Sequence, residues 1–549
     1  MAQTCSIGAS VARERLPGTS ALFSDFLARH ERVAGFFPAD PRDLAERLDP
    51  GEMLAGRSFD RARLADILAR QNRGWSASGE TMAAIERLRG PDVLAVVTGQ
   101  QVGLFTGPLY AVYKALSVLQ LTRALRRRLG ERFVPLFWMA AGDHDLREID
   151  HAVLPDRSGR PVTVRHGREY PPDRPVGSLT LGPEIETTLG RVRELLPESE
   201  FRDRVMELLT AAYRPGHTFA GGFARAMLAL FAEGGLILVD PTDGELKALC
   251  RPLLERELDL APAAAGLVIE RGRELVARGY HAQLQPAPDQ ANLFLIDQDR
   301  RLGLVAESGG FRLRGTDRIL GKKALRELLG QDPGRFSPGA ALRPLMQDSL
   351  LPVAAYVAGP SETAYLAQLG PLYERFDVPR PPVYPRMSLT LMEARLGEIL
   401  EAAGMDPAEV FAPAGRLAGR LSERQLPADV EADIAAAEAG IDEALGRLSG
   451  RIAGLEPTMK EYLASVSGKI GHQLRAVRKK LLQARRARDE TLRRRAARLS
   501  DALYPQGRLQ ERMYTIIPFL ARHGTGLIGR LDAMDLEPWQ HHLITLSGG

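Results

Sequence analysis

Apolar runs that end in polar or glycine-containing turns recur along this chain, and helical patterns separate them. Four of these runs predict buried strands: Leu94–Thr98, Val134–Met139, Leu236–Val239 and Val353–Val357. A helix is predicted from Pro108 to near Gly130, because proline suits the first turn of a helix. Strands that alternate with helices in this way favour a doubly wound α/β core around a parallel sheet.

Other segments depart from this alternation. The first ninety residues are predicted to be helical, since Leu22, Phe23 and Phe26 recur at helical spacing. An antiparallel insert is predicted around Asn292–Ile296 and Gly303–Ala306. The expected organisation is 1–150, N-terminal helices and the first half of the core; 151–215, a first insertion of short strands and a helix; 216–279, the core continued; 280–345, a second, antiparallel insertion; 346–390, the end of the core; 391–505, a helical coiled-coil arm; and 506–549, a tail that packs on the body.

The clearest periodic pattern lies between residues 430 and 500. Apolar residues follow one another at spacings of three and four, which is typical of a coiled-coil seam; they are Val430, Ile434, Ala437, Ile441, Ala444, Leu448, Ile452 and Leu455, then Met459, Leu463, Val466, Ile470, Leu474, Val477 and Leu481. A break at Glu456–Pro457 and a capping box at Thr458–Glu461 separate two helices, which so short a turn makes antiparallel. The second helix stays apolar beyond any partner in the same chain, at Leu492, Ala496 and Leu499. We therefore expect a homodimer through this region.

Composition narrows the class of protein. A chain of 549 residues with 44% hydrophobic and 26% charged residues is typical of a globular protein with two to four domains. A net charge of +4 argues against bulk nucleic-acid binding, and the basic run Arg475–Arg498 is expected to be a solvated helix face rather than an RNA-binding arm. Only Cys5 and Cys250 occur, so no disulfide framework is expected. With no signal peptide and no apolar run of roughly 20 residues, we expect a cytoplasmic location without membrane association.

The loop after the first predicted strand is a candidate ligand site. Gln100, Gln101, Gly103, Thr106 and Gly107 lie between that strand and the helix. Free amide N–H groups and the positive end of the helix dipole favour an anion there, such as a phosphate or a carboxylate. A tight turn without any ligand is the alternative.

The loop after the second predicted strand carries three ionisable side chains in succession. Asp143, His144 and Asp145 would be costly to bury, so they are expected to face a cleft. His144 could act as a general base or bind substrate, with Asp143 or Asp145 fixing its tautomer. A solvated turn with a capping aspartate is the alternative. No metal is predicted, because the sequence has no matching cluster of ligands elsewhere.

Two later segments are candidates for the opposite wall of the cleft. Gly359, Ser361 and Glu362 follow the fourth predicted strand and open another helix, which is again an anion-receptive geometry. Ser361 could equally be the cap of that helix. Arg386 is suited to bidentate contact with phosphate or carboxylate, and Ser388 follows it in the turn Tyr384–Thr390; an ordinary surface loop is the alternative.

Taken together, these segments resemble the bacillithiol biosynthesis cysteine-adding enzyme family (BshC). The resemblance extends in the family's order over nearly the whole chain, through Gln100–Tyr110, Gly142–Asp145, Phe336–Pro338, Leu342–Asp348, Tyr356–Glu362 and Leu509–Arg512. It implies a Rossmann-like core related to class I aminoacyl-tRNA synthetases, with connecting-peptide insertions. It also implies a C-terminal coiled coil that contributes to dimerisation.

The reaction that this resemblance implies joins the carboxyl group of cysteine to the amine of glucosaminyl-malate and completes bacillithiol. Such an amide needs an activated carboxylate, so an acyl-adenylate made from ATP with Mg²⁺ is the natural hypothesis; no tightly bound cofactor is expected. The family pattern has glycine where Ser361 stands and often histidine where Tyr113 stands, and the first loop has no His-x-Gly-His.

The resemblance also assigns roles to residues of this chain. Gly103, Thr106 and Gly107 are expected to hold an anionic group of nucleotide or substrate, and His144 and Asp145 to orient the reacting groups. Asp143 is expected to be catalytic together with His144 and Asp145. Gln100, Gln101 and Tyr110 would bind substrate or nucleotide in the same cleft, and Gly359, Ser361, Glu362, Arg386 and Ser388 would close it. Two alternatives stay open: a nucleotidyltransferase-like ligase acting on another amino acid and amine, and a non-catalytic coiled-coil scaffold that binds RNA.

Overall fold

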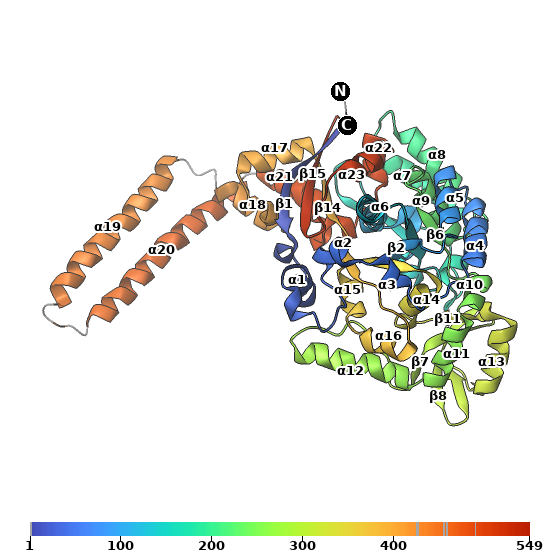
Figure 1. Ribbon diagram of the computed structural model, residues 1–549. Coiled ribbons are helices and arrows are strands. Elements are labelled where there is room, and N and C mark those ends of the chain that lie inside the picture. Colours follow the sequence, from blue (N-terminus) through green and yellow to red (C-terminus); the bar gives the residue numbers. More distant parts are fainter. Residues whose placement is uncertain (1–2, 424–427, 454–455, 457–458, 489, 549) are drawn as a thin grey trace. The chain divides into compact units, whose positions relative to one another are not determined.

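The computed structural model describes residues 3–423, 428–453, 456, 459–488 and 490–548 of the chain. It separates into two compact units. The main unit comprises residues 1–157, 161–391 and 510–549, and the coiled-coil unit comprises residues 158–160 and 392–509. Figure 1 shows the elements of both.

A five-stranded parallel sheet forms the centre of the main unit. Its order is β13-β12-β2-β3-β6, and its strands are β2 (Leu94–Gln100), β3 (Phe133–Met139), β6 (Ile237–Val239), β12 (Val353–Ala358) and β13 (Val383–Pro385). β2, β3, β6 and β12 lie where the four strands were predicted, so that prediction is confirmed. The chain leaves β2 toward β3 and β6 on one side and later returns to build β12 and β13 on the other. This is the doubly wound α/β order that the sequence predicts.

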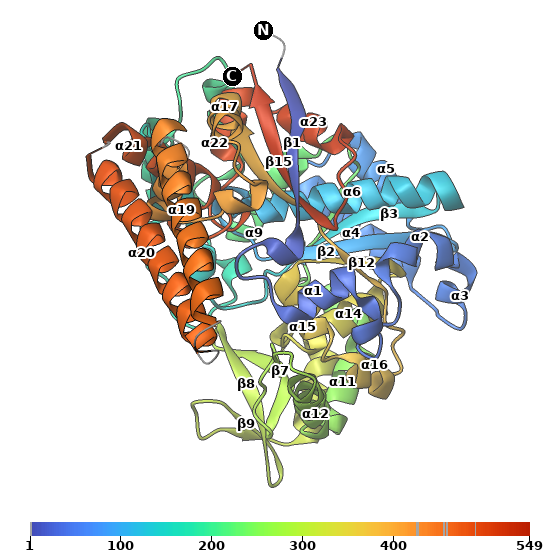
Figure 2. The same ribbon diagram turned by 90° about the vertical axis from the view of Figure 1, so that its left-hand side faces the viewer.

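Both faces of this sheet are buried, which explains its apolar strands. Leu94 and Val96 of β2 belong to one hydrophobic core, and Ala95 and Val97 belong to the other. Helix α6 (Leu109–Leu129) contributes to the first core, and α4 (Arg61–Gly74) and α5 (Gly79–Arg87) contribute to the second. Figure 2 shows α6 along the strands β2 and β3.

The remaining helices of the main unit connect these strands or precede them. Before the sheet lie α1 (Ala21–Ala28), α2 (Leu44–Arg47) and α3 (Pro50–Leu54). Between its strands lie α9 (Phe219–Leu230), α10 (Gly244–Leu249), α11 (Arg251–Leu260), α12 (Ala263–Ala277), α14 (Leu342–Leu350), α15 (Pro360–Leu366) and α16 (Gly370–Phe376). The helical prediction for the first ninety residues therefore holds from residue 21 onward.

That prediction is wrong for the start of the chain, which forms a strand. β1 (Thr4–Ala12) pairs antiparallel with β15 (Gln540–Ser547), with Thr4 opposite Ser547. β14 (Ser388–Glu393) lies on the other side of β15, so the sheet order is β1-β15-β14. The predicted polar turn Tyr384–Thr390 is also wrong, because β13 and β14 occupy most of it. The partners of all these strands are remote in sequence, so no local pattern predicts the strands.

Two further sheets lie in the predicted insertions. In the first, β4 (His151–Pro155) pairs antiparallel with β5 (Pro161–Arg165), followed by α7 (Glu184–Leu195) and α8 (Arg202–Ala212), one helix more than predicted. The second is antiparallel, as predicted, in the order β10-β9-β8-β7-β11. Its elements are β7 (Gln290–Asp297), β8 (Arg300–Glu307), β9 (Gly310–Leu313), β10 (Ile319–Leu320), β11 (Phe336–Pro338) and the helix α13 (Lys322–Gln331).

The described part of the coiled-coil unit is mainly helical, with α17 (Ala394–Ala403), α18 (Ala414–Glu423), α19 (Ala428–Ala453), α20 (Met459–Arg488) and α21 (Glu490–Leu503). α19 and α20 run antiparallel, as predicted, because Glu431 bonds to Arg478 and Asp442 bonds to Ser467. The predicted seam residue Leu455, the break at Pro457 and the cap at Thr458 lie outside the described residues.

Five of the described residues that were predicted to lie in the seam between α19 and α20 are exposed. They are Ala437 and Ala444, and Leu448, Val477 and Leu481, which are 44%, 61% and 39% exposed. Leu445 and Leu482 are more buried than these residues. A helix with 3.6 residues per turn drifts away from a strict repeat of 3.5, which moves the later predicted positions off the seam.

Helices α22 (Ile517–His523) and α23 (Leu527–Ala533) complete the main unit near the end of the chain. Ile517, Leu520 and Leu531 are fully buried in the first hydrophobic core. Among the described helices, none combines the length and apolar character that crossing a membrane requires.

Candidate active site

The strand order makes the carboxyl ends of β2 and β12 the expected place for a ligand-binding crevice. Connections leave these two neighbouring strands in opposite directions, and ligands of doubly wound sheets bind at such a point. Gln100 ends β2, while Gly359 and Glu362 directly follow β12. Three predicted site residues therefore lie together at this switch point.

A buried lysine joins the two sides of the crevice. Lys114 on α6 is 2% exposed, and its Nζ donates to the carbonyl of Gly99 at 2.5 Å and to Oε1 of Gln100 at 2.8 Å. The same ammonium contacts Oε2 of Glu362 at 2.5 Å. Glu362 also accepts hydrogen bonds from the amide of Gly359 at 2.8 Å and the hydroxyl of Tyr356 at 2.7 Å. Lys114 thus ties the end of β2 to the start of α15.

The environment keeps both partners of this pair charged at neutral pH. Burial lowers the pKa of Lys114 to about 8, and the neighbouring Glu362 carboxylate opposes that shift. Burial would raise the pKa of Glu362, but Lys114 and the other donors outweigh it and hold the pKa below its usual value. Sequence analysis missed Lys114. Its signal is a single lysine inside the apolar run from Leu109 to Leu119.

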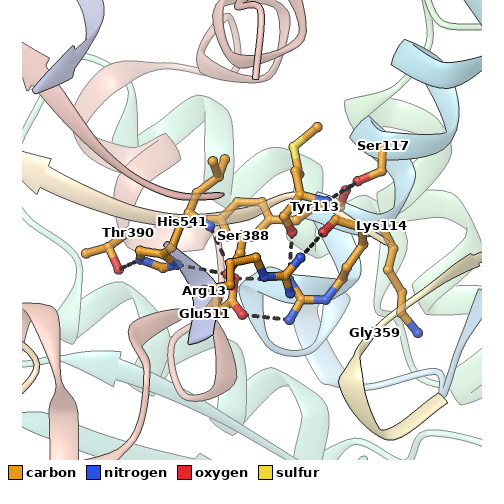
Figure 3. Close-up of polar contacts among 12 residues, drawn as sticks. Arg13, Tyr113, Lys114, Ser117, Gly359, Ser388, Thr390, Glu511 and His541 are labelled. Atoms are coloured by element: carbon orange, nitrogen blue, oxygen red, sulfur yellow. Dashed lines mark hydrogen bonds and ion pairs between the residues drawn. The ribbon is translucent and has the colours of Figure 1, made fainter. Parts of the chain in front are cut away.

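A second buried pair lies where β13 passes into β14. Arg386 and Glu511 have side chains only 3% and 2% exposed, and Arg386 donates to the two carboxylate oxygens at 2.6 and 3.0 Å. Ser388 donates to Glu511 at 3.0 Å. His541 contacts the hydroxyls of Ser388 and Thr390, each at 2.8 Å, and Figure 3 shows its ring between them. These contacts unite β13, β14, β15 and the segment before α22.

Strong pKa shifts accompany this cluster. Burial would raise the pKa of Glu511, but Arg386 overcomes it and lowers the pKa to about 2. Burial lowers the pKa of His541 to about 3, so its ring is neutral. Arg13 donates to the carbonyl of Arg386 at 2.8 Å, and burial together with the Arg386 charge lowers the pKa of Arg13 to about 9.

Arg386 and Ser388 are therefore not on a surface loop, which makes that alternative wrong. The carboxylate that Arg386 binds through two hydrogen bonds belongs to Glu511 of this chain and not to a ligand. Arg386 still borders the crevice, because its guanidinium lies 5.7 Å from the ring centre of Tyr110. A β-carbon built on Gly359 would also lie 3.4 Å from its Nε atom.

The loop Gly103–Gly107 is packed into the body of the protein. Gly103 has no room for a side chain, since a β-carbon would lie 2.8 Å from the α-carbon of Gly107. The amide of Thr106 donates to the hydroxyl of Tyr213, and the amide of Leu109 at the start of α6 donates to a carbonyl in the tail. The prediction assumed that the amides of this loop and helix start are free, and that assumption is wrong for these two. Their use by an anionic ligand stays a prediction.

The loop after β3 is more open. Gln101 donates to Asp143 at 3.1 Å, and Asp143 accepts the backbone N–H of His144 at 2.7 Å. Nδ1 of His144 lies 3.4 Å from Oδ1 of Asp143 and 3.2 Å from Nη1 of Arg301. The side chains of Asp143 and His144 are 41% and 43% exposed. Asp143, rather than Asp145, is therefore the acid beside the imidazole.

These contacts shift two pKa values. A hydrogen bond to Asp143 raises the pKa of His144, while burial and the Arg301 charge oppose the rise. The same contact with His144 holds the pKa of Asp143 well below its usual value. Asp145 is exposed and accepts the amide of Arg147 at 3.1 Å, so it caps a short turn as the simpler alternative predicted.

The wall after β12 differs from its prediction in one detail. Gly359 occupies the N-cap of α15, and Glu362 closes the capping box by accepting its amide. Ser361 is exposed and does not cap the helix. Within the described residues, no group of three or more His, Cys, Asp or Glu side chains is placed to hold a metal ion.

Comparison with known proteins accounts for both units of the chain. The model of the N-terminal Rossmann-like domain of the bacillithiol biosynthesis protein BshC matches residues 10–387. The model of its C-terminal coiled-coil domain matches residues 389–546.

Relatives named as proposed cysteine ligases BshC align over nearly their whole lengths. The protein from Salinibacter ruber is 37% identical over 526 residues, which are 95% of this chain and 96% of the relative. The proteins from Chlorobaculum tepidum and Koribacter versatilis are each 34% identical. These two alignments cover 94% and 96% of this chain, and 94% and 98% of the relatives.

Proposed function

Because this chain belongs to the BshC family of bacillithiol biosynthesis, we propose that it is a ligase that joins the carboxyl group of cysteine to the amine of glucosaminyl-malate. The observation that carries the proposal is the match over both units to proteins named as cysteine ligases. The polar groups at the carboxyl edge of the sheet support it, because this is where doubly wound enzymes bind their ligands.

His144 is the residue best suited to accept the proton that amide formation releases. The amine nitrogen attacks the activated carboxyl carbon of cysteine, forms the C–N bond and loses a proton. The bond between that carbon and its activating group breaks, and this group leaves with the electron pair. An imidazole that is part-exposed and paired with Asp143 can accept this proton at Nε2. Gln101 holds Asp143 in place from the end of β2. In this proposal, Lys114 and Glu362 fix the shape of the crevice.

Activation of the cysteine carboxyl by ATP stays a prediction of the family resemblance. A triphosphate needs several cationic or amide donors. Lys114 and Arg386, two cations that border the crevice, already hold carboxylates of this chain. These two cations are therefore not free for a triphosphate, and no step is assigned to ATP. Incubating the protein with both substrates and labelled ATP tests the prediction, which requires one AMP or ADP for each amide formed.

Complementation of a strain that lacks the native ligase tests the function. We expect His144→Ala to abolish bacillithiol and to cause glucosaminyl-malate to accumulate, as mass spectrometry of labelled thiols and of the amine would show. Asp145→Ala, which changes an exposed turn cap, is the matched control and should restore the thiol. Normal bacillithiol with His144→Ala would contradict the role of His144. A normal thiol pool in the deletion strain itself would instead favour a ligase for another amino acid and amine.

We also propose a homodimer through the coiled-coil unit and a cytoplasmic location. The expectation that Leu492, Ala496 and Leu499 lack a partner in the same chain is wrong, because all three are buried within this chain; the dimer is proposed instead from α20. Tyr462, Val477 and Leu481 of α20 are between 39% and 61% exposed, and apolar side chains along one long helix favour a second helix as partner. Light scattering should give twice the chain mass for the wild type and the chain mass for Val477→Glu/Leu481→Lys. A monomeric wild type at micromolar concentration would contradict the dimer.

A further inference from the structure

Arg301 of the second insertion reaches the loop after β3. It lies on β8 and is 8% exposed. Its Nε donates to Oγ of Ser337 at 3.0 Å, and its Nη2 donates to the carbonyl of Pro338 at 3.0 Å. Its guanidinium carbon lies 3.6 Å from the ring centre of Phe294. Since β7, β8 and β11 belong to one sheet, three neighbours from adjacent strands fix this guanidinium in one position.

The remaining arm of the guanidinium points at the proposed base. Nη1 of Arg301 donates to Nδ1 of His144 at 3.2 Å. Burial lowers the pKa of Arg301 to about 10, with Asp143 opposing the shift, so the group is still a cation at neutral pH. A guanidinium only donates hydrogen bonds, so it requires a lone pair on Nδ1.

Asp143 makes the opposite demand on the same atom. Its Oδ1 lies 3.4 Å from Nδ1 of His144, and a carboxylate can only accept, so this contact requires a hydrogen on Nδ1. The two partners therefore cannot both be satisfied. With Arg301 as partner, a neutral His144 carries its hydrogen on Nε2. With Asp143 as partner, Nε2 of the neutral ring is free to accept a proton.

We propose that Arg301 is a positioning residue that competes with Asp143 for Nδ1 of His144 and thereby sets which ring nitrogen carries the proton. The inference rests on the proposed function, in which Nε2 of His144 takes the proton of the amine. While Arg301 holds Nδ1, His144 offers a donor to the substrate. When Nδ1 turns to Asp143, the ring becomes the base.

Other charges around the imidazole are few. Asp173 adds a weaker negative field that raises the pKa of His144, and Arg300 pairs with Asp173 at 2.9 Å. Among the described residues, Asp143, Arg301 and Asp173 are the charged groups with the largest effect on the pKa of this ring. Removing Arg301 takes away the cation that opposes Asp143 at the ring, so the proton affinity of His144 should rise.

Titration of His144 in the full chain tests the inference without relying on activity. Histidine labelled with ¹³C in the ring would be followed by NMR, with His144→Ala assigning the signal. We expect Arg301→Met to raise the midpoint by about one pH unit, a roughly tenfold gain in proton affinity, and Arg301→Lys to raise it less. Arg318→Met, an exposed arginine of the same insertion that pairs with Asp297, should leave the midpoint unchanged.

The outcomes separate the inference from the proposed function. An unchanged His144 midpoint in folded Arg301→Met or Arg301→Lys would overturn the inference whatever the enzyme does. A raised midpoint supports it, and the pH dependence of kcat/KM for amide formation should then move in the same direction. A raised midpoint with an unchanged pH profile would leave the competition for Nδ1 standing and would remove His144 from the proposed mechanism.

Discussion

Two buried ion pairs in the main unit have the same chemistry but different surroundings. The carboxylate of Glu511 is 2% exposed and receives donors from Arg386, Ser388 and the amide of Leu389. The carboxylate of Glu362 is 16% exposed and lies at the switch point of the sheet. Both pairs join segments that are more than a hundred residues apart in the chain, but the Lys114–Glu362 pair is the more exposed of the two.

The difference indicates what each pair is for. A buried pair is weak evidence for net stability, but removing one partner leaves a buried charge uncompensated. The Glu511 side chain is only 2% exposed, so its loss should affect folding most. The Glu362 side chain is 16% exposed at the carboxyl edge of the sheet, so its loss should affect activity more than folding.

The largest effect on stability is expected at Glu511. Glu511→Gln removes the countercharge of Arg386, and we expect a loss of about 3–5 kcal/mol in the free energy of unfolding, measured by denaturant titration. Glu194→Gln is the control, because it breaks an exposed pair with Arg191 and should change the value by less than about 1 kcal/mol. Equal losses of stability in the two variants would show that the buried pair contributes no more to folding than the exposed pair.

Lys114→Met is expected to cost less stability and more activity. Glu362 keeps two other donors, so we expect a loss of about 1–3 kcal/mol, together with a fall in kcat of at least tenfold. The double variant Lys114→Met/Glu362→Gln removes both charges. It should regain most of the stability and none of the activity. Full activity in the stable double variant would show that this pair does not shape the crevice.

Acid should weaken the cluster around Glu511 selectively. His541 has a pKa of about 3 in the folded protein against 6.5 as its ordinary value, so only the unfolded chain binds this proton between those values. The free energy of unfolding should therefore fall as the pH drops below 6.5, by about 2 kcal/mol at pH 5. Glu511, with a folded pKa of about 2 against 4.5, adds a further loss below pH 4.5.

The comparison variant for this effect is His541→Gln, which keeps hydrogen-bonding groups and lacks the titration. Between pH 7 and pH 5, the free energy of unfolding of this variant should fall by about 2 kcal/mol less than that of the wild type, because the His541 contribution is missing. Parallel curves for the two proteins would show that His541 does not carry the acid sensitivity.

The smallest effect is expected at Thr106. Its Oγ1 is buried without a hydrogen-bond partner in the structure, so the isosteric Thr106→Val should leave stability unchanged or raise it by up to about 1 kcal/mol. Calorimetric melting checks this expectation. A raised KM in the variant would support the predicted ligand contact of this hydroxyl.

The sequence predicts those strands that can be recognised from their own run of apolar residues. The apolar runs of β2, β3, β6 and β12 identified the central sheet, and the polar residues that follow them marked its carboxyl edge. β13 is only three residues long and holds a proline, and β1 is paired with β15 across more than 500 residues. Their stability comes from partners that no local window contains.

The site was predictable to the same extent. Gln100, His144 and Glu362 follow strands and could be placed by that rule. Lys114 and Arg301 could not, because each acts through a contact between elements that the sequence does not bring together. Glu511 stands inside the segment Leu509–Arg512 that supported the family resemblance, yet its partner Arg386 could be found only from the structure.

The pairing of β1 with β15 has a consequence for biosynthesis. A ribosome makes Arg13 and Arg386 long before Glu511 and His541, and β14 has no place beside β15 until residues 540–547 have emerged. During most of translation, Arg13 and Arg386 are therefore present without the partners that surround them in the folded protein. A chain interrupted before its last strand would leave these charges without their partners and would leave β1 and β14 without the strand that pairs with both.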